Sequence, residues 1–190
     1  QGFRHSYDML GEAALTAEDA ARYLVAYEQA IDAIGAAAAD MSTRRGAAWG
    51  GIYEGPGISI KLSALHPRYA RAQAQRVHGE LYPRLLGLAQ RARTHDIGLN
   101  IDAEEADRLE LSLDLLERLC HEPSLAGWQG IGFVIQAYGK RCPAVIDWLV
   151  DLGRRSGHRL MVMVRLMRPD AEGRLRPLQE DASFELTLCQ

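Results

Sequence analysis

The sequence lacks the long apolar runs and the cysteine pairs that mark membrane proteins and small secreted domains. No apolar run approaches the ~20 residues of a membrane-spanning helix, and the polar N-terminus QGFRHSYD contains no apolar signal segment. Cys120, Cys142 and Cys189 form no CxxC pair, and their odd number favours a reducing compartment. We therefore expect a cytoplasmic location. Because residue 1 is Gln, we also expect the chain to begin inside a longer one.

Several compact motifs for catalysis and ligand binding are missing as well. No apolar strand is followed by GxGxxG or by a P-loop, and GxSxG is absent. The six histidines show neither HxH nor HExxH spacing, so we expect no metal site. The net charge is −3 and the basic residues are dispersed. These features argue against a nucleic-acid partner for this segment.

What the chain contains is a regular alternation of apolar strands and amphipathic helices. Its 190 residues, 47% hydrophobic and 25% charged, are enough for one folded domain. The pattern predicts strands at 5–13, 57–65, 98–104, 130–138 and 158–166. It predicts helices from an N-cap at Thr16 to about residue 34, and over 71–95, 106–120 and 143–155. The Ala/Gly-rich stretch 35–51 is expected to be a flexible surface connection.

Strands that are apolar on both faces, separated by amphipathic helices, predict a parallel sheet covered by helices. Two α/β architectures fit this order, a doubly wound sheet and a (β/α)8 barrel, complete or partial. The lack of a phosphate-binding glycine loop weakens the doubly wound alternative. This favours the barrel, complete or partial, to which this chain would contribute about five strands and four helices.

Each predicted strand also carries a polar residue: Lys61 lies within the second strand, and Glu12, Asp102, Gln136 and Arg165 lie at or near the ends of the other four. Functional groups of a barrel collect at the C-terminal ends of its strands. We therefore predict that Asp102 faces a site, with Lys61 as its partner, because a nearby cation offsets the cost of burying a carboxylate. Glu104 and Glu105 are expected to begin the next helix, where the helix dipole favours acids.

Simpler explanations exist for the same residues. Asp102 has the position of an ordinary helix N-cap. Lys61 could extend its stem from an edge strand, and Gln136 could satisfy backbone groups. The recurrence of polar residues at the same end of successive strands is what favours a site over these alternatives.

Five stretches of the chain stand out: SYDMLGEAALT, YEGPGISIKLSALHPRY, NIDAEEADRLE, GFVIQAY followed by KRCP, and RLMV followed by RL. Together they resemble the proline dehydrogenase domain of the bifunctional bacterial flavoproteins called proline utilisation A. The resemblance covers roughly residues 3–166, in the same order of strands and helices. It implies a distorted (β/α)8 barrel that binds FAD and oxidises L-proline to Δ1-pyrroline-5-carboxylate. It also implies electron transfer to a quinone or another acceptor, and transient association of the full-length enzyme with the inner membrane.

The same motifs imply roles for individual residues. Lys61 of SIKLSAL would lie beside the flavin and the proline, and Asp102 of NIDAEE would lie in the active site. Ala103 would pack against the flavin, and Gln136 of VIQAY would hydrogen-bond to its ring system. Arg165 would contact the flavin near N5, where a cation favours the reduced, anionic form.

The resemblance also implies a role for Glu12 of the first motif, MLGEAA, which would pair with an arginine at the substrate entrance.

Residues 167–190 do not resemble the family, which divides the chain into residues 1–166, the N-terminal part of the barrel, and a divergent tail. The later strands and the paired arginines that hold the proline carboxylate in the family would then be absent, so we expect a truncated segment. Two other possibilities remain open. One is a non-catalytic half-barrel without flavin; the other is a different barrel enzyme acting on a small acid or a phosphorylated ligand. Full-length relatives carry an aldehyde dehydrogenase domain and some a DNA-binding domain, and we assign neither activity to this chain.

Overall fold

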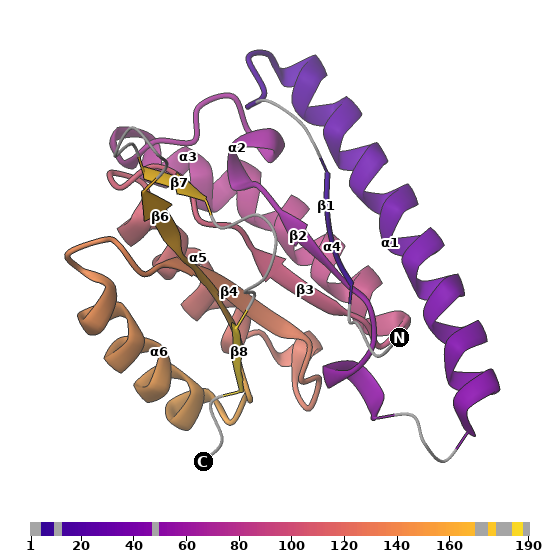
Figure 1. Ribbon diagram of the computed structural model, residues 1–190. Coiled ribbons are helices and arrows are strands. Elements are labelled where there is room, and N and C mark those ends of the chain that lie inside the picture. Colours follow the sequence, from indigo (N-terminus) through magenta and orange to yellow (C-terminus); the bar gives the residue numbers. More distant parts are fainter. Residues whose placement is uncertain (1–4, 10–12, 47–49, 170–174, 178–183, 188–190) are drawn as a thin grey trace.

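The sheet of this protein runs in chain order from its first strand to its fifth (Figure 1). A computed structural model describes residues 5–9, 13–46, 50–169, 175–177 and 184–187. Its strands are β1 (Ser6–Asp8), β2 (Gly57–Ile60), β3 (Gly98–Ile101), β4 (Ile131–Gln136), β5 (Met161–Arg165), β6 (Met167–Pro169), β7 (Leu175–Pro177) and β8 (Phe184–Thr187).

The connecting segments are mostly helical. The α-helices are α1 (Ala17–Arg45), α2 (Leu62–Leu65), α3 (Ala74–Arg76), α4 (Tyr82–Thr94), α5 (Leu109–Cys120) and α6 (Cys142–Ser156). Short 3-10 turns form η2 (Gly51–Tyr53), η3 (Arg71–Gln73) and η5 (Pro123–Leu125), and a π-helical turn forms η4 (Val77–Leu81).

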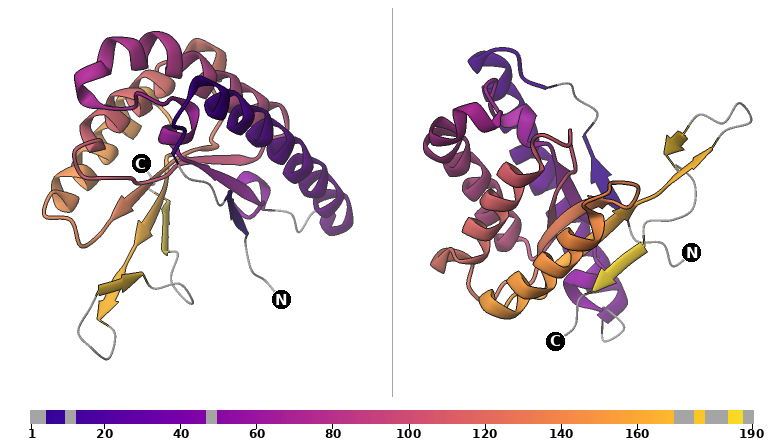
Figure 2. Two further views of the ribbon diagram at one scale, coloured as in Figure 1. Left: turned by 90° about the horizontal axis from the view of Figure 1, so that it is seen from above. Right: turned by 90° about the vertical axis from the view of Figure 1, so that its left-hand side faces the viewer.

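Strands β1 to β5 pair in parallel, in the order β1-β2-β3-β4-β5. The helices lie on one side of this curled sheet (Figure 2). A doubly wound sheet would reverse its strand order and carry helices on both faces. The structure therefore confirms the predicted half-barrel and excludes the doubly wound alternative. Strand β8 adds an antiparallel partner on the outer edge of β5, and β6 and β7 form a separate two-stranded ribbon.

The two faces of the sheet have different residues because successive side chains of a strand point to opposite sides. The helix-facing residues belong to the main hydrophobic core, with Ile60, Ile101 and Phe133 in one row across three strands. The concave face carries the alternate residues, including Ser59 and Asn100 in the neighbouring row. The strand ends that follow this concave row are where polar side chains can meet.

Helix α1 is longer than the sequence predicts. Thr16 caps it as expected: its hydroxyl accepts a hydrogen bond from Asp19 N, and the Asp19 side chain returns to the backbone of Thr16. The helix then continues to Arg45, so the expectation of a flexible connection was wrong for residues 35–45. Alanine is the strongest helix former, which explains why this stretch stays helical. Gly35 is buried there against His95 of α4's C-terminal end.

The predicted helix over 71–95 is instead divided into η3, α3, η4 and α4. Pro83 lies in the first turn of α4 and has no N–H to donate to the preceding turn. The π-helical turn η4 directly precedes it, and such turns arise where the regular i→i−4 bonding is interrupted.

Candidate functional site

Asp102 follows the last residue of β3 and is the most deeply buried charge at the C-terminal end of the sheet. Its side chain is 1% exposed, and its backbone N–H donates to the carbonyl of Ile60 on β2. Its Oδ1 accepts a hydrogen bond from Ala103 N at 2.9 Å. A carboxylate can remain charged in such a place only with nearby cations or hydrogen-bond donors.

Lys61 supplies the first of these cations. It follows β2 and serves as N-cap residue of α2, so it lies just beyond the strand rather than within it. Its Nζ lies 3.1 Å from Asp102 Oδ2 and 2.7 Å from Asp8 Oδ1. Burial tends to lower the pKa of Lys61, but the carboxylates of Asp8 and Asp102 outweigh it and raise the pKa above its ordinary value. The predicted pairing of Lys61 with Asp102 is therefore confirmed.

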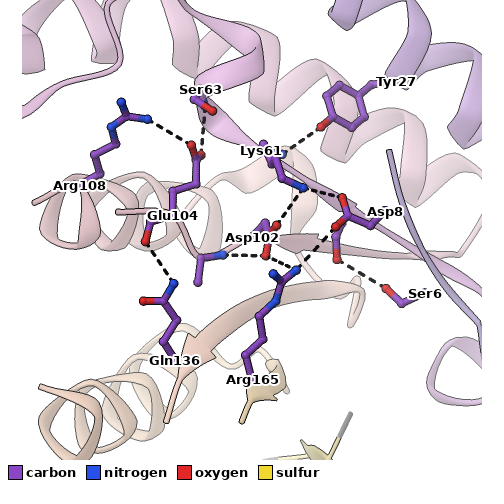
Figure 3. Close-up of polar contacts among 12 residues, drawn as sticks. Ser6, Asp8, Tyr27, Lys61, Ser63, Asp102, Glu104, Arg108, Gln136 and Arg165 are labelled. Carbon is purple, nitrogen blue, oxygen red and sulfur yellow. Dashed lines mark hydrogen bonds and ion pairs between the residues drawn. The ribbon is translucent and has the colours of Figure 1, made fainter. Parts of the chain in front are cut away.

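Arg165 supplies the second cation from the end of β5 and completes a ring of four charges (Figure 3). Its Nη2 lies 2.9 Å from Asp102 Oδ1 and 3.6 Å from Asp8 Oδ2. Each cation thus touches both carboxylates, and the ring has no net formal charge. We call Asp8, Lys61, Asp102 and Arg165 the charge ring.

Gln136 and Glu104 lie beside the charge ring. Gln136 ends β4 in register with Arg165, and its Nε2 donates to the carbonyl of Glu104 at 3.3 Å. Glu104 and Glu105 were expected to begin the next helix, but α5 starts only at Leu109, so this expectation was wrong. The Glu104 side chain bonds elsewhere. Its Oε1 instead accepts a hydrogen bond from Ser63 N of α2, and its Oε2 lies 3.3 Å from Arg108 Nη1.

A cavity of about 260 Å³ adjoins this end of the sheet. Asp102, Ala103 and Gln136 line it together with apolar side chains of β4 and of the flanking helices, and with the charged side chains of Lys140 and Arg141. The apolar lining includes Phe133, Val134, Leu109 and Val145. An apolar wall next to a carboxamide that can both donate and accept hydrogen bonds fits a flat ring whose edge alternates N–H and C=O groups. The residues present are therefore compatible with a flavin ring system.

The structure places Lys61 and Arg165 in contact with Asp102. Gln136 pairs in register with Arg165, and Ala103 directly follows Asp102. Glu12 lies outside the described residues. Asp8 was missed in the sequence because the first strand was expected to continue to residue 13, whereas β1 ends at Asp8. Functional groups of a barrel collect at the C-terminal ends of its strands, and Asp8 occupies such an end once β1 is taken to end there.

The described part of the chain contains no group of three or more His, Cys, Asp and Glu side chains placed to hold a metal ion. Within the same residues, no helix is both long and apolar enough to span a bilayer.

Comparison with known proteins gives consistent matches. The family described as "Proline dehydrogenase" matches residues 1–168. The bifunctional protein PutA of Salmonella typhimurium is 72% identical over 162 residues, which are 85% of this chain and 12% of that protein. PutA of Rhizobium meliloti is 59% identical over 185 residues, 97% of this chain and 14% of that protein, so the similarity continues past residue 166.

Solved structures agree with the sequence matches. A crystal structure of proline utilization A from Bradyrhizobium japonicum superposes with a TM-score of 0.77 at 51% identity, covering 86% of this chain and 16% of that one. The chain thus spans only a small part of the length of these relatives. By the family match over residues 1–168 and by these identities, the chain belongs to the proline dehydrogenase family.

Proposed function

We propose that this chain provides the first half of a proline dehydrogenase site, at which L-proline is oxidised to Δ1-pyrroline-5-carboxylate with FAD. The observation that carries the proposal is the charge ring, built from the C-terminal ends of four parallel strands. A chain that needed only a stable barrel would gain little from it, because buried ion pairs are often no more stabilising than apolar side chains of the same volume.

The charge ring suits a small zwitterion with one cationic and one anionic group. Lys61 lies between Asp8 and Asp102 and is held protonated by them, so it offers a fixed positive charge beside proline. Asp102 offers a buried negative charge. Its attraction to a substrate cation would be strong, because charges interact more strongly where water is excluded. We assign to Lys61 and Asp102 the orientation of the substrate, and to Glu12 a place at the substrate entrance.

FAD, when bound, would accept the hydride that leaves Cδ of proline, the carbon next to nitrogen that does not bear the carboxylate. Ala103 and Gln136 line the cavity that would hold its ring system. Arg165 keeps 42% of its side chain exposed and lies at the rim of the charge ring, where a cation favours the anionic reduced form. We further propose a quinone or another acceptor for the electrons, and a cytoplasmic location with transient membrane contact of the full-length enzyme.

The test is anaerobic addition of L-proline to the purified chain after incubation with FAD. Retained flavin whose visible absorption is bleached by L-proline, and restored by an added quinone, would support the proposal. A chain that retains no flavin and binds the dye ANS strongly would support the non-catalytic half-barrel instead, since ANS reports exposed apolar surface. D-Proline serves as the control for a stereospecific site.

A further inference from the structure

Tyr27 is a buried tyrosine in the middle of α1 whose hydroxyl reaches the candidate site. Its side chain is 1% exposed, and the hydroxyl accepts a hydrogen bond from Lys61 N at 3.0 Å (Figure 3). The two residues are 34 positions apart in the chain. It is the one hydrogen bond that the described residues show between α1 and the charge ring.

The backbone of Lys61 needs such a partner because of its position. Lys61 directly follows β2, so it lies beyond the last strand pairing, where Ile60 faces Ile101. Its side chain points to Asp8 and Asp102 and makes no capping bond to α2. A buried N–H without an acceptor is costly, and the Tyr27 hydroxyl is the acceptor that this strand end provides.

We propose that Tyr27 is a positioning residue: its hydroxyl fixes the backbone of Lys61 and thereby holds Lys61 Nζ between Asp8 and Asp102. The proposal adds a residue to the function proposed above. The geometry on which it depends, however, involves only residues of this chain. Helix α1 packs against α2, β2 and α4, so it forms a rigid support for this hydrogen bond.

A general loss of packing or of a buried hydroxyl must be separated from a specific effect on Lys61. Tyr82 provides a matched control, because it is also a buried tyrosine, 3% exposed, whose hydroxyl donates to Arg118 O and lies near Glu122. It has no contact with the charge ring among the described residues. Tyr82→Phe therefore removes a comparable buried hydroxyl whose partners, Arg118 and Glu122, lie outside the charge ring.

The chain allows a direct measurement on Lys61 because it contains only two lysines, Lys61 and the exposed Lys140. Amines react with formaldehyde and borohydride only when deprotonated, so reductive methylation reports how firmly a lysine is held as a cation. Mass spectrometry of the digested chain gives the rate at Lys61 relative to Lys140. The measurement uses the chain alone and requires no activity.

We expect Tyr27→Phe to raise this ratio about two- to tenfold, the range that one net hydrogen bond corresponds to, and Tyr82→Phe to leave it unchanged. An unchanged ratio in a folded Tyr27→Phe chain, or an equal rise in both variants, would overturn the proposal. If Tyr27→Phe does not fold, hydrogen exchange in the unaltered chain decides: a protected Lys61 amide supports the hydrogen bond, and an unprotected one refutes it.

Kinetics then separate this proposal from the proposed function. If the unaltered chain oxidises proline, Tyr27→Phe should lower kcat/KM for proline by a similar factor, and Tyr82→Phe should not. If the unaltered chain shows no proline oxidation, the proposed function fails, while the labelling result still decides the role of Tyr27.

Discussion

Asp102 combines nearly complete burial with three close partners: the ammonium of Lys61, the guanidinium of Arg165 and the amide of Ala103. Removing one member of a buried ion pair typically costs about 3–5 kcal/mol, because the remaining charge is left without compensation. At this position, however, the two cations both keep Asp8 as a second partner. Loss of Asp102 should therefore affect chemistry more than folding.

We expect Asp102→Ala to lower proline turnover by about 100-fold or more, as loss of a group that orients and stabilises the reacting centre does, while flavin stays bound. The measurement is best made with residues 1–166 transplanted into the matching segment of the Salmonella relative, to which the chain is 72% identical. Flavin content by absorbance is the internal control. Undiminished turnover in Asp102→Ala would remove this residue from the site.

The charge ring also has a pH signature. The pKa of Lys61 is higher in the folded chain than its ordinary value of 10.5. Protonated Lys61 thus contributes stability below pH 10.5, and this contribution is lost as the pH rises through the folded-state pKa. Burial is the largest single effect and lowers this pKa, and the hydrogen bond that Lys61 Nζ donates to Asp8 is the largest of the effects that raise it.

Asp8→Asn should therefore destabilise the chain at neutral pH, and the difference in unfolding free energy from the unaltered chain should shrink above pH 10.5. Urea unfolding at several pH values measures this difference directly. A difference that stays constant through the alkaline range would mean that Asp8 stabilises the fold without holding the charge of Lys61.

Contacts between helices decide whether a helical glycine can be replaced by alanine without loss of stability. A Cβ at Gly35 would overlap the ring of His95, whose Nε2 lies 3.1 Å from Asp32 Oδ1. Gly87 in α4 is exposed, and a Cβ there would meet nothing within 4 Å. The two glycines share a helical backbone and differ only in what surrounds them.

Gly87→Ala should stabilise the chain by about 0.5–1 kcal/mol, the difference in helix propensity. Gly35→Ala should destabilise it by about 1–3 kcal/mol, because overpacking outweighs the same propensity gain. Thermal unfolding of the two variants side by side tests both signs. Stabilisation by Gly35→Ala would show that α1 can move away from α4 without cost.

Much of this architecture was predictable because apolar runs and helical spacing are local signals. The five parallel strands, the Thr16 cap and Pro143 in the first turn of α6 follow from them. Contacts between distant segments were not: Tyr27 meets Lys61 only because α1 folds back over β2, and Glu104 caps α2 rather than its own helix. Of the candidate site, Lys61, Asp102 and Arg165 were found together, whereas Asp8 depended on the exact end of β1.

At the scale of the whole molecule, β1 and β8 are the two edge strands of the six-stranded sheet. The outer edge of β5 is paired by β8 over Met161–Val164. An unpaired strand edge offers N–H and C=O groups to other chains and promotes association. The antiparallel pairing of β8 therefore protects an edge that the parallel strands alone would expose.

Deleting residues 178–190, which removes β8, should leave the five parallel strands folded and increase self-association. Sedimentation velocity at several concentrations measures the effect, with a deletion of residues 188–190 as control, since it keeps β8. Circular dichroism verifies that helix content is retained. Equal, concentration-independent masses for both deletions would show that β8 is not needed to protect the edge of β5.

The alternation of the two faces along β3 has a consequence for how this chain tolerates change over time. Ile101 packs into the hydrophobic core, and Asn100 and Asp102, its neighbours on either side, face the concave surface. Successive residues of this segment therefore serve the hydrophobic core and the candidate site in turn. Substitutions can vary one set and spare the other, but a single inserted or deleted residue within the strand would exchange them, placing Asp102 in the core and Ile101 in the site. In such a segment the length of the strand is under stricter constraint than most of its individual residues.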